Sequence, residues 1–126
     1  MPRFERTEAG GGPLVRGFAD GRFVVDGVIR AAVLMTPERA MTWEAPPIGA
    51  LTPDHLMEVL ALDPAPEFLL LGTGPTLVRP PKTFVQALEA RGVGVEVMDS
   101  RAAARTWAVL RAEERWIVAA LMPLST

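Results

Sequence analysis

The sequence predicts an α/β domain in which helices pack against a sheet whose strands are largely parallel. Between Glu67 and Pro123 the chain alternates apolar strand-like runs with amphipathic segments, a pattern typical of α/β layers. The runs are continuously apolar, as expected for strands that are covered on both faces. A glycine-rich turn follows the first of them. The predicted strands of this part are residues 67–71, 93–98 and 116–122.

The first third of the chain predicts an antiparallel β meander. Asp20-Gly21 and Asp26-Gly27 are turn dipeptides, because glycine accepts a positive φ without a steric cost. The runs around them are rich in strand-forming residues. The meander either extends the main sheet or packs as a small sheet beside it. Its predicted strands are residues 22–25, 28–35 and 40–43.

Three helices are expected between and before the parallel strands. Thr52-Pro53 begins the first, because threonine is a good N-cap and proline suits the first helical position. The second runs from about Pro81 to Arg91, with Gly92 as the residue that follows its end. Asp99 and Ser100 can cap the third. The residues expected to face inward are Leu56, Val59 and Leu60, then Phe84, Val85 and Leu88, then Ala102, Ala103, Thr106, Val109 and Leu110.

The length of 126 residues suits a single domain with its own core. Residues 1–13 contain Gly10-Gly11-Gly12-Pro13, which does not hold regular structure. We therefore expect a flexible N-terminal tail over residues 1–13 and one α/β domain over residues 14–126.

The composition argues against most enzymatic chemistry. The chain has no cysteine and no tyrosine, and its one histidine and one lysine are His55 and Lys82. Covalent catalysis is therefore disfavoured, and no catalytic residue, metal site or cofactor is predicted. The net charge of -2 is spread along the chain, so no nucleic acid partner is indicated. No apolar run approaches the roughly 20 residues of a membrane helix, and we expect a cytoplasmic protein.

One candidate ligand site is the turn Gly72-Thr73-Gly74, which follows a buried strand and precedes a helix. Phosphate-binding turns occupy such positions, because backbone N–H groups and a helix N-terminus favour an anion. Leu77 stands where a dinucleotide fingerprint needs its third glycine, and the P-loop pattern is absent. The alternative is a tight turn that needs a positive φ.

Two further groups of residues are candidates. Ser100, Arg101 and Arg105 lie at the start of the third helix, where two guanidinium groups could hold a carboxylate or phosphate. A structural ion pair is the alternative for these arginines. Trp43 and Trp107 are large aromatics flanked by polar residues, which suits interface anchors or pocket walls, with core packing as the alternative.

The stretch from Glu96 to Trp107, together with Gly72-Thr73-Gly74, resembles a family of small single-domain proteins. That family includes the mitochondrial complex I assembly factor 3 and a human adipogenesis-associated protein. Its pattern contains Ala-Cys-Arg-Thr-Tyr-Asn, in which Ala104 here stands for the cysteine, Trp107 for the tyrosine and Ala108 for the asparagine. The residues that follow in register are Leu110, Glu113, Arg115 and Ala119-Ala120-Leu121.

The resemblance implies a three-layer fold around a mixed sheet and no established enzymatic activity. For the mitochondrial member it implies an assembly role through protein partners. Our leading hypothesis is therefore a non-enzymatic interaction protein with protein partners, as in respiratory complex assembly. The alternative is a small-molecule or anion-binding domain, an enzyme included, that uses the Gly72–Thr76 turn and Arg105. A third reading is a homodimer formed through Trp43 or an edge strand.

Overall fold

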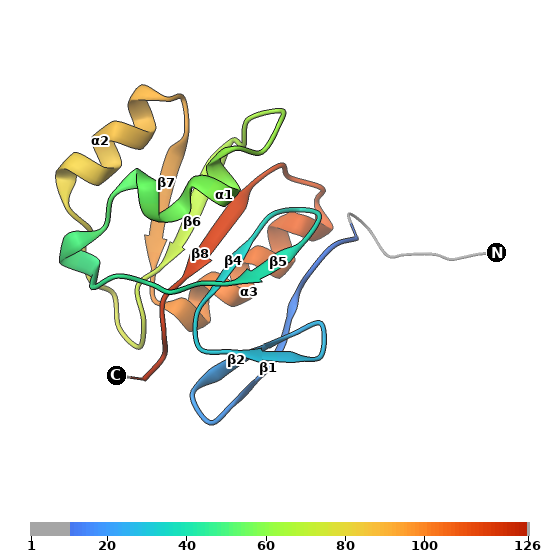
Figure 1. Cartoon of the computed structure of the whole chain (residues 1–126). Coiled ribbons are helices and arrows are strands. Elements are labelled where there is room, and N and C mark those ends of the chain that lie inside the picture. The colour runs from blue at the N-terminus through green and yellow to red at the C-terminus, as the bar shows by residue number, and fades with distance from the viewer. Residues whose placement is uncertain (1–10, 126) are drawn as a thin grey trace.

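The computed structural model describes residues 11–125 and confirms the predicted α/β class. A five-stranded mixed sheet lies at the centre, with α1 and α2 on one face and α3 on the other (Figure 1). A three-stranded antiparallel sheet packs beside this layer. Of the predicted tail, residues 1–10 lie outside the described residues. Pro13 is buried, so contact with the domain extends at least to this position.

The small sheet consists of β1 (Val15–Ala19), β2 (Arg22–Val25) and β3 (Val28–Arg30), in the order β1-β2-β3. Both predicted turns are confirmed, because Asp20-Gly21 and Asp26-Gly27 each have two consecutive positive φ angles. That geometry matches the twist of a tight hairpin. Phe23 and Val25 are completely buried and pack in the same cluster as α3.

The predicted strand over residues 28–35 is wrong as one element. The structure divides it into β3, which ends at Arg30, and β4 (Val33–Met35), which belongs to the main sheet. Val28 and Ile29 are about half exposed, whereas all three β4 residues are buried. The chain leaves one sheet for the other at Ala31 and Ala32, so the meander supplies a separate sheet and also extends the main one.

The main sheet has the order β5-β4-β8-β6-β7. Strand β6 (Phe68–Gly72) lies between β7 (Gly94–Met98) and β8 (Val118–Leu121) and runs parallel to both. Strand β4 pairs antiparallel with β8 and with the edge strand β5 (Ala40–Thr42). Leu69, Leu70 and Leu71 are 0% exposed, which confirms that β6 is covered on both faces.

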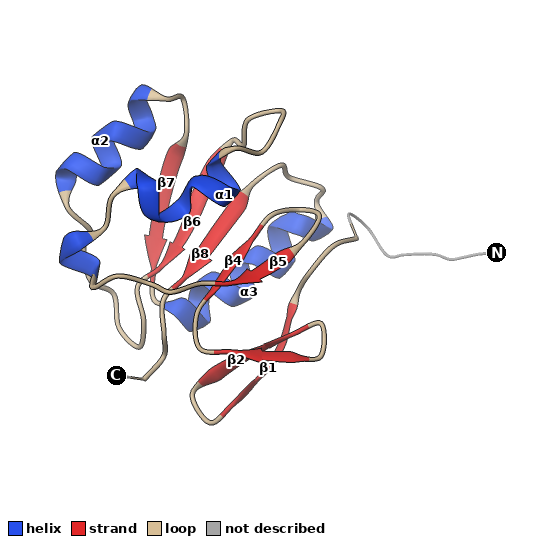
Figure 2. Ribbon diagram, in the orientation of Figure 1, coloured by secondary structure: helices blue, strands red, loops and turns tan. Residues whose placement is uncertain are grey.

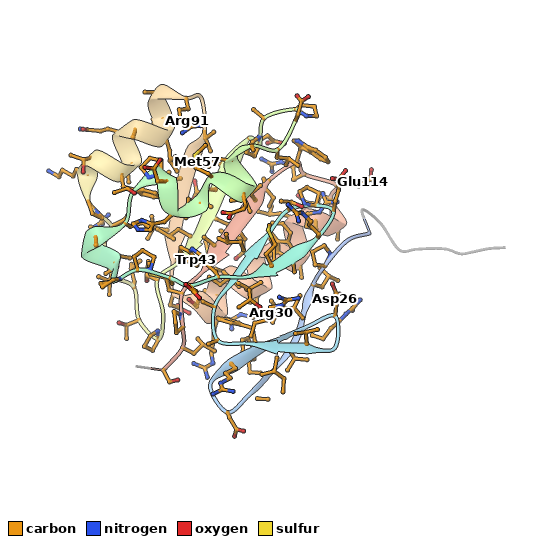
Figure 3. The ribbon with its side chains drawn as sticks, in the orientation of Figure 1. Asp26, Arg30, Trp43, Met57, Arg91 and Glu114 are labelled. Carbon is orange, nitrogen blue, oxygen red and sulfur yellow. The ribbon has the colours of Figure 1, made fainter. Side chains whose placement is uncertain are left out.

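The helices lie where the sequence predicts them (Figure 2). The first consists of a 3-10 turn, η2 (Pro53–Leu56), followed by α1 (Met57–Leu60), and a separate 3-10 turn, η1 (Ile48–Ala50), precedes it. Helix α2 (Lys82–Ala90) ends before Gly92, whose φ of 82° confirms its role after the helix end. Arg91 reaches from the end of α2 to Met57, where its Nη1 atom lies 3.8 Å from the Met57 Sδ atom (Figure 3).

Helix α3 (Ser100–Ala112) is rotated relative to the prediction. Its buried face contains Ala103, Ala104 and Trp107, whereas Val109 is 58% exposed. The predicted inward face is therefore wrong by about one position. Burial of the large indole of Trp107 removes more apolar area from water than burial of Val109 would. No helix in residues 11–125 is long and apolar enough to cross a membrane.

A surface ion pair joins the start of β6 to the segment before β8. Arg115 Nη2 lies 2.8 Å from Glu67 Oε1, and this hydrogen bond is the main reason that the pKa of Glu67 is below its ordinary value. Because the pKa is depressed, the stabilisation exists above the ordinary carboxyl pKa and is lost as the pH falls through the folded-state pKa.

We expect Arg115→Gln to return the pKa of Glu67 toward its ordinary value. The measurement is an NMR titration of the side-chain carboxyl carbon, with Arg79→Gln as a matched control on an exposed arginine. The stability difference from wild type should shrink at acidic pH. An unchanged Glu67 pKa in Arg115→Gln would contradict the assigned cause.

Candidate functional site

The structure places the Gly72-Thr73-Gly74 turn directly beside Ser100, the first residue of α3. Ser100 is 0% exposed. Its Oγ accepts a hydrogen bond from the Gly74 N–H and donates one to the Met122 carbonyl, both at 2.8 Å. One hydroxyl therefore joins the end of β6, the start of α3 and the end of β8.

The polar groups of this turn bind to the chain itself. The Thr73 N–H donates to the Met98 carbonyl at 2.9 Å, and the Gly74 N–H is taken by Ser100. The Thr73 hydroxyl donates to the Thr76 carbonyl at 2.7 Å and accepts from the Val78 N–H at 3.0 Å. The φ of Gly74 is 103°, as the tight-turn alternative requires. Residues 73 and 74 consequently offer no free amide to an anion.

The two arginines lie on the exposed side of α3, away from Ser100. The guanidinium carbon of Arg101 is 5.4 Å from the ring centre of Phe18 in β1. Arg105 has no ion pair within residues 11–125. The N-terminus of α3 is capped by Asp99, whose carboxylate accepts from the Ala102 N–H at 2.9 Å. The six residues predicted for ligand binding thus divide between a buried junction and an exposed helix face.

A shallow cavity of about 330 Å³ does lie against the turn. Thr73 and Pro75 form one side, and the segment before η1 forms the other. None of its lining side chains is charged. The remaining lining residues are Ala45, Pro46, Pro47, Ile48, Met122, Pro123 and Ser125.

The two candidate tryptophans lie in different apolar clusters. Trp107 is 0% exposed, and its indole N–H donates to the Pro13 carbonyl at 2.8 Å. It is a core residue with no surface for a partner. Ala108, at the position of the family's asparagine, lines a cavity of about 160 Å³ beside α3. Trp43 packs on the opposite face of the sheet.

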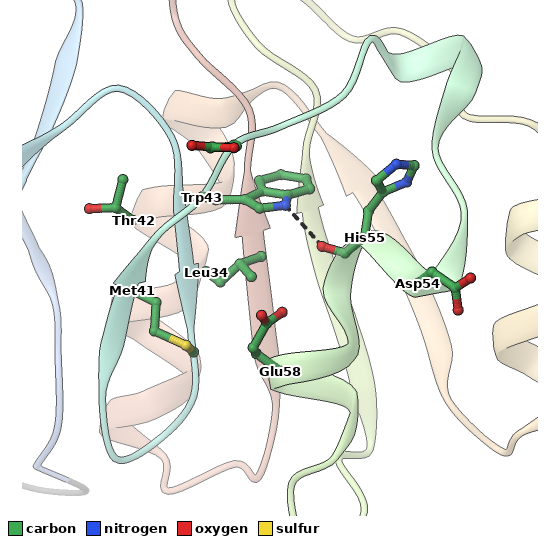
Figure 4. Close-up of a pocket in the computed structure, with 8 residues that line it drawn as sticks. Leu34, Met41, Thr42, Trp43, Asp54, His55 and Glu58 are labelled. Atoms are coloured by element: carbon green, nitrogen blue, oxygen red, sulfur yellow. Dashed lines mark hydrogen bonds between the residues drawn. The ribbon is translucent and has the colours of Figure 1, made fainter.

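A pocket of about 490 Å³ opens beside Trp43. The backbone N–H of Trp43 donates to the Ala32 carbonyl at 3.1 Å, and this bond continues the pairing of the β4–β5 hairpin. Its indole N–H donates to the His55 carbonyl at 3.0 Å (Figure 4). The first bond fixes the backbone of Trp43 to the hairpin, and the second fixes its indole against η2, with 7% of the residue exposed. The other lining residues are Leu34, Met41, Thr42, Glu44, Asp54, His55 and Glu58.

The helical wall of the pocket is fixed by the N-terminus of η2. The Thr52 N–H donates to His55 Nδ1 at 3.0 Å, and the Thr52 hydroxyl lies 3.2 Å from the same atom. His55 therefore closes a capping box and is only partly exposed. This box sets the position of Asp54 and of the His55 carbonyl.

The pocket combines an apolar floor with an acidic rim. Leu34, Met41 and Trp43 form the floor, and the side chains of Met41 and Glu58 reach toward the space in front of Leu34 (Figure 4). The rim carboxylates are Glu44, Asp54 and Glu58, all exposed and without an ion pair inside residues 11–125.

This arrangement suits a basic side chain of a partner, because its aliphatic stem can pack against the apolar floor while its charge meets the carboxylates. Across the described part of the chain, no group of three or more histidine or acidic side chains could hold a metal ion.

Sequence reasoning identified Trp43 but missed the acidic rim of its pocket. Its three carboxylates come from two separate segments and carry no local motif.

Residues 15–122 match the protein family described as "Protein of unknown function (DUF498/DUF598)". An uncharacterized protein of Rhodobacter capsulatus is 35% identical over 111 residues, which cover 87% of this chain and 84% of that protein. The NADH dehydrogenase (ubiquinone) 1 alpha subcomplex assembly factor 3 of Danio rerio is 28% identical over 119 residues, covering 94% of this chain and 68% of that protein. A crystal structure of a Bordetella parapertussis protein has a TM-score of 0.78 at 37% identity and covers 88% of this chain and 95% of that chain.

Proposed function

This chain belongs to the DUF498/DUF598 family of proteins of unknown function, and from that premise we propose that it is a non-enzymatic, assembly-factor-like protein that binds protein partners. The similarity to a Danio rerio protein named as an assembly factor supports this function. The observation that carries it is the pocket beside Trp43, with its apolar floor and acidic rim.

The pocket has the composition of an interface anchor. Tryptophan is enriched among the residues that dominate binding energy, and such residues lie in pockets surrounded by polar groups. The Trp43 indole is already held in place by its hydrogen bond to the His55 carbonyl, so little side-chain freedom is lost when a partner docks. The partner that fits is a protein segment presenting an arginine or lysine.

The anion-binding alternative has less support from the same structure. The amides of Thr73 and Gly74 are already engaged, and Arg105 is exposed on α3. The cavity beside the turn has no charged lining residue. An anion would find neither converging donors nor a positive wall there.

The test is affinity capture from native lysate with the wild type and the double variant Glu44→Arg/Glu58→Arg. Each exposed ion pair contributes up to about 1 kcal/mol, so reversing two charges should weaken partner binding by on the order of tenfold. Glu113→Arg, an exposed reversal at the end of α3, is the matched control. Partners that are captured equally by all three proteins, at equal thermal stability, would contradict this site.

A further inference from the structure

Strand β7 is an open edge of the main sheet. It pairs with β6 on one side only. The Gly94 N–H donates to the Glu67 carbonyl at 3.2 Å, and the Met98 carbonyl accepts from the Thr73 N–H at 2.9 Å. Because backbone groups alternate in direction along a strand, the N–H and C=O groups of Val95 and Val97 point away from the sheet. Nothing in residues 11–125 bonds to these outward groups.

This edge has few of the features that prevent strand addition. Residues 94–98 contain no proline and no lysine, and Glu96 is the one charged residue. Proteins usually protect exposed edges with such residues, with bulges or with a covering segment. The β7 edge is therefore a template for a further strand.

A groove of about 410 Å³ runs beside the edge. Val95 and Val97 form its floor, and the outer side of α2 forms its wall through Lys82, Gln86 and Glu89. Since α2 connects two parallel strands, it runs antiparallel to β7. Lys82 consequently lies toward the Met98 end and Glu89 toward the Gly94 end. Neither side chain makes an ion pair within the described range.

We propose that the occupant of this edge is a second copy of the chain, with its β7 antiparallel to the first about a two-fold axis. A two-fold contact requires a surface that complements itself. Antiparallel copies bring the basic end of one α2 next to the acidic end of the other, so Lys82 of each copy faces Glu89 of its counterpart. The charge order along the groove meets that requirement.

The strand register is also compatible with two copies. A two-fold axis beside Val95 or Val97 places Glu96 opposite Gly94 or Met98 of the other copy, so the glutamates do not face each other. In this dimer the two β7 strands would lie about 4.8 Å apart, and the two α2 helices would pack about 8–10 Å apart.

The Trp43 pocket adjoins β5 at the opposite edge of the sheet. Dimer formation and partner binding at the pocket are therefore independent, and each can fail without the other.

The test is sedimentation equilibrium of the full chain at micromolar concentration. We expect a dimer for the wild type. Lys82→Glu and Glu89→Lys alone should each raise the dissociation constant of the dimer by on the order of tenfold, because the like-charged contact between positions 82 and 89 occurs twice. The double variant Lys82→Glu/Glu89→Lys should dimerise again. An equimolar mixture of the two single variants should also form heterodimers, since each supplies the charge that the other lacks.

Amide hydrogen exchange separates strand pairing from a contact between helices alone. Exchange at Val95 and Val97 should slow as the protein concentration rises, whereas the exposed Val28 serves as a control. A monomeric wild type at tens of micromolar would overturn the proposal. So would dimers that both single charge variants leave unchanged, or dimers without concentration-dependent protection of Val95 and Val97.

Discussion

Replacing Gly72 with alanine should lower the free energy of unfolding by about 3 kcal/mol, the upper part of the usual range for overpacking. A Cβ at this position would lie 2.8 Å from both Cα and Oγ of Ser100 and 2.9 Å from Cδ2 of Leu121. The Ser100 Cα is backbone and cannot rotate away. Its Oγ is held by two hydrogen bonds, so relief would require α3 to move away from β6.

Urea unfolding of Gly72→Ala and Gly49→Ala measures this effect against a matched control. A Cβ added at Gly49 meets no atom within 4 Å, and its φ is outside the left-handed region. Alanine there should be neutral or stabilise by up to about 1 kcal/mol, by restricting the unfolded chain. Equal unfolding midpoints for the two variants would show that β6 and α3 do not approach as closely as described.

The result also bears on how the Gly-Thr-Gly turn is interpreted. A phosphate-binding turn needs glycine so that a ligand can approach the backbone. Here the atoms that approach Gly72 belong to Ser100 and Leu121 of the same chain. The glycine therefore has a structural reason that needs no ligand.

The fold class could be predicted because its signals are local. The apolar run at β6 reflects burial on both faces, and the two Asp-Gly turns and the Thr52-Pro53 helix start depend on neighbouring residues alone. The break after Arg30 has no such signal, because β3 and β4 are contiguous apolar segments that enter different sheets. Only the tertiary arrangement separates them.

The candidate site shows the same limit more strongly. The sequence grouped Ser100 with Arg101 and Arg105 because they are close along the chain, but a helix turns by about 100° per residue and directs them to different faces. The Trp43 pocket instead combines residues from β4, β5, η2 and α1. Its carboxylates have ordinary spacing for surface residues, so nothing local indicates that they share a rim.

Trp107→Ala should destabilise the domain by about 3–5 kcal/mol, the usual cost of removing a buried tryptophan. Trp107 is the largest fully buried side chain among residues 11–125. Trp116 provides a matched control, because its indole also donates to a carbonyl, that of Pro64 at 2.7 Å, yet it is partly exposed. Trp116→Ala should cost about 1 kcal/mol, mainly the lost hydrogen bond. Equal losses for the two variants in urea unfolding would contradict the core role of Trp107.

Trp107→Phe divides that loss into packing and hydrogen bonding. Phenylalanine keeps an aromatic ring in the core but cannot donate to the Pro13 carbonyl, 94 residues away in the sequence. A buried acceptor left without its donor costs about 1–3 kcal/mol, so this variant should lie between the wild type and Trp107→Ala. The bond also explains the rotation of α3, since an indole that must reach Pro13 fixes which helix face turns inward. If Trp107→Phe is as stable as the wild type, packing alone sets the rotation of α3, and the hydrogen bond to Pro13 contributes nothing to the free energy of unfolding.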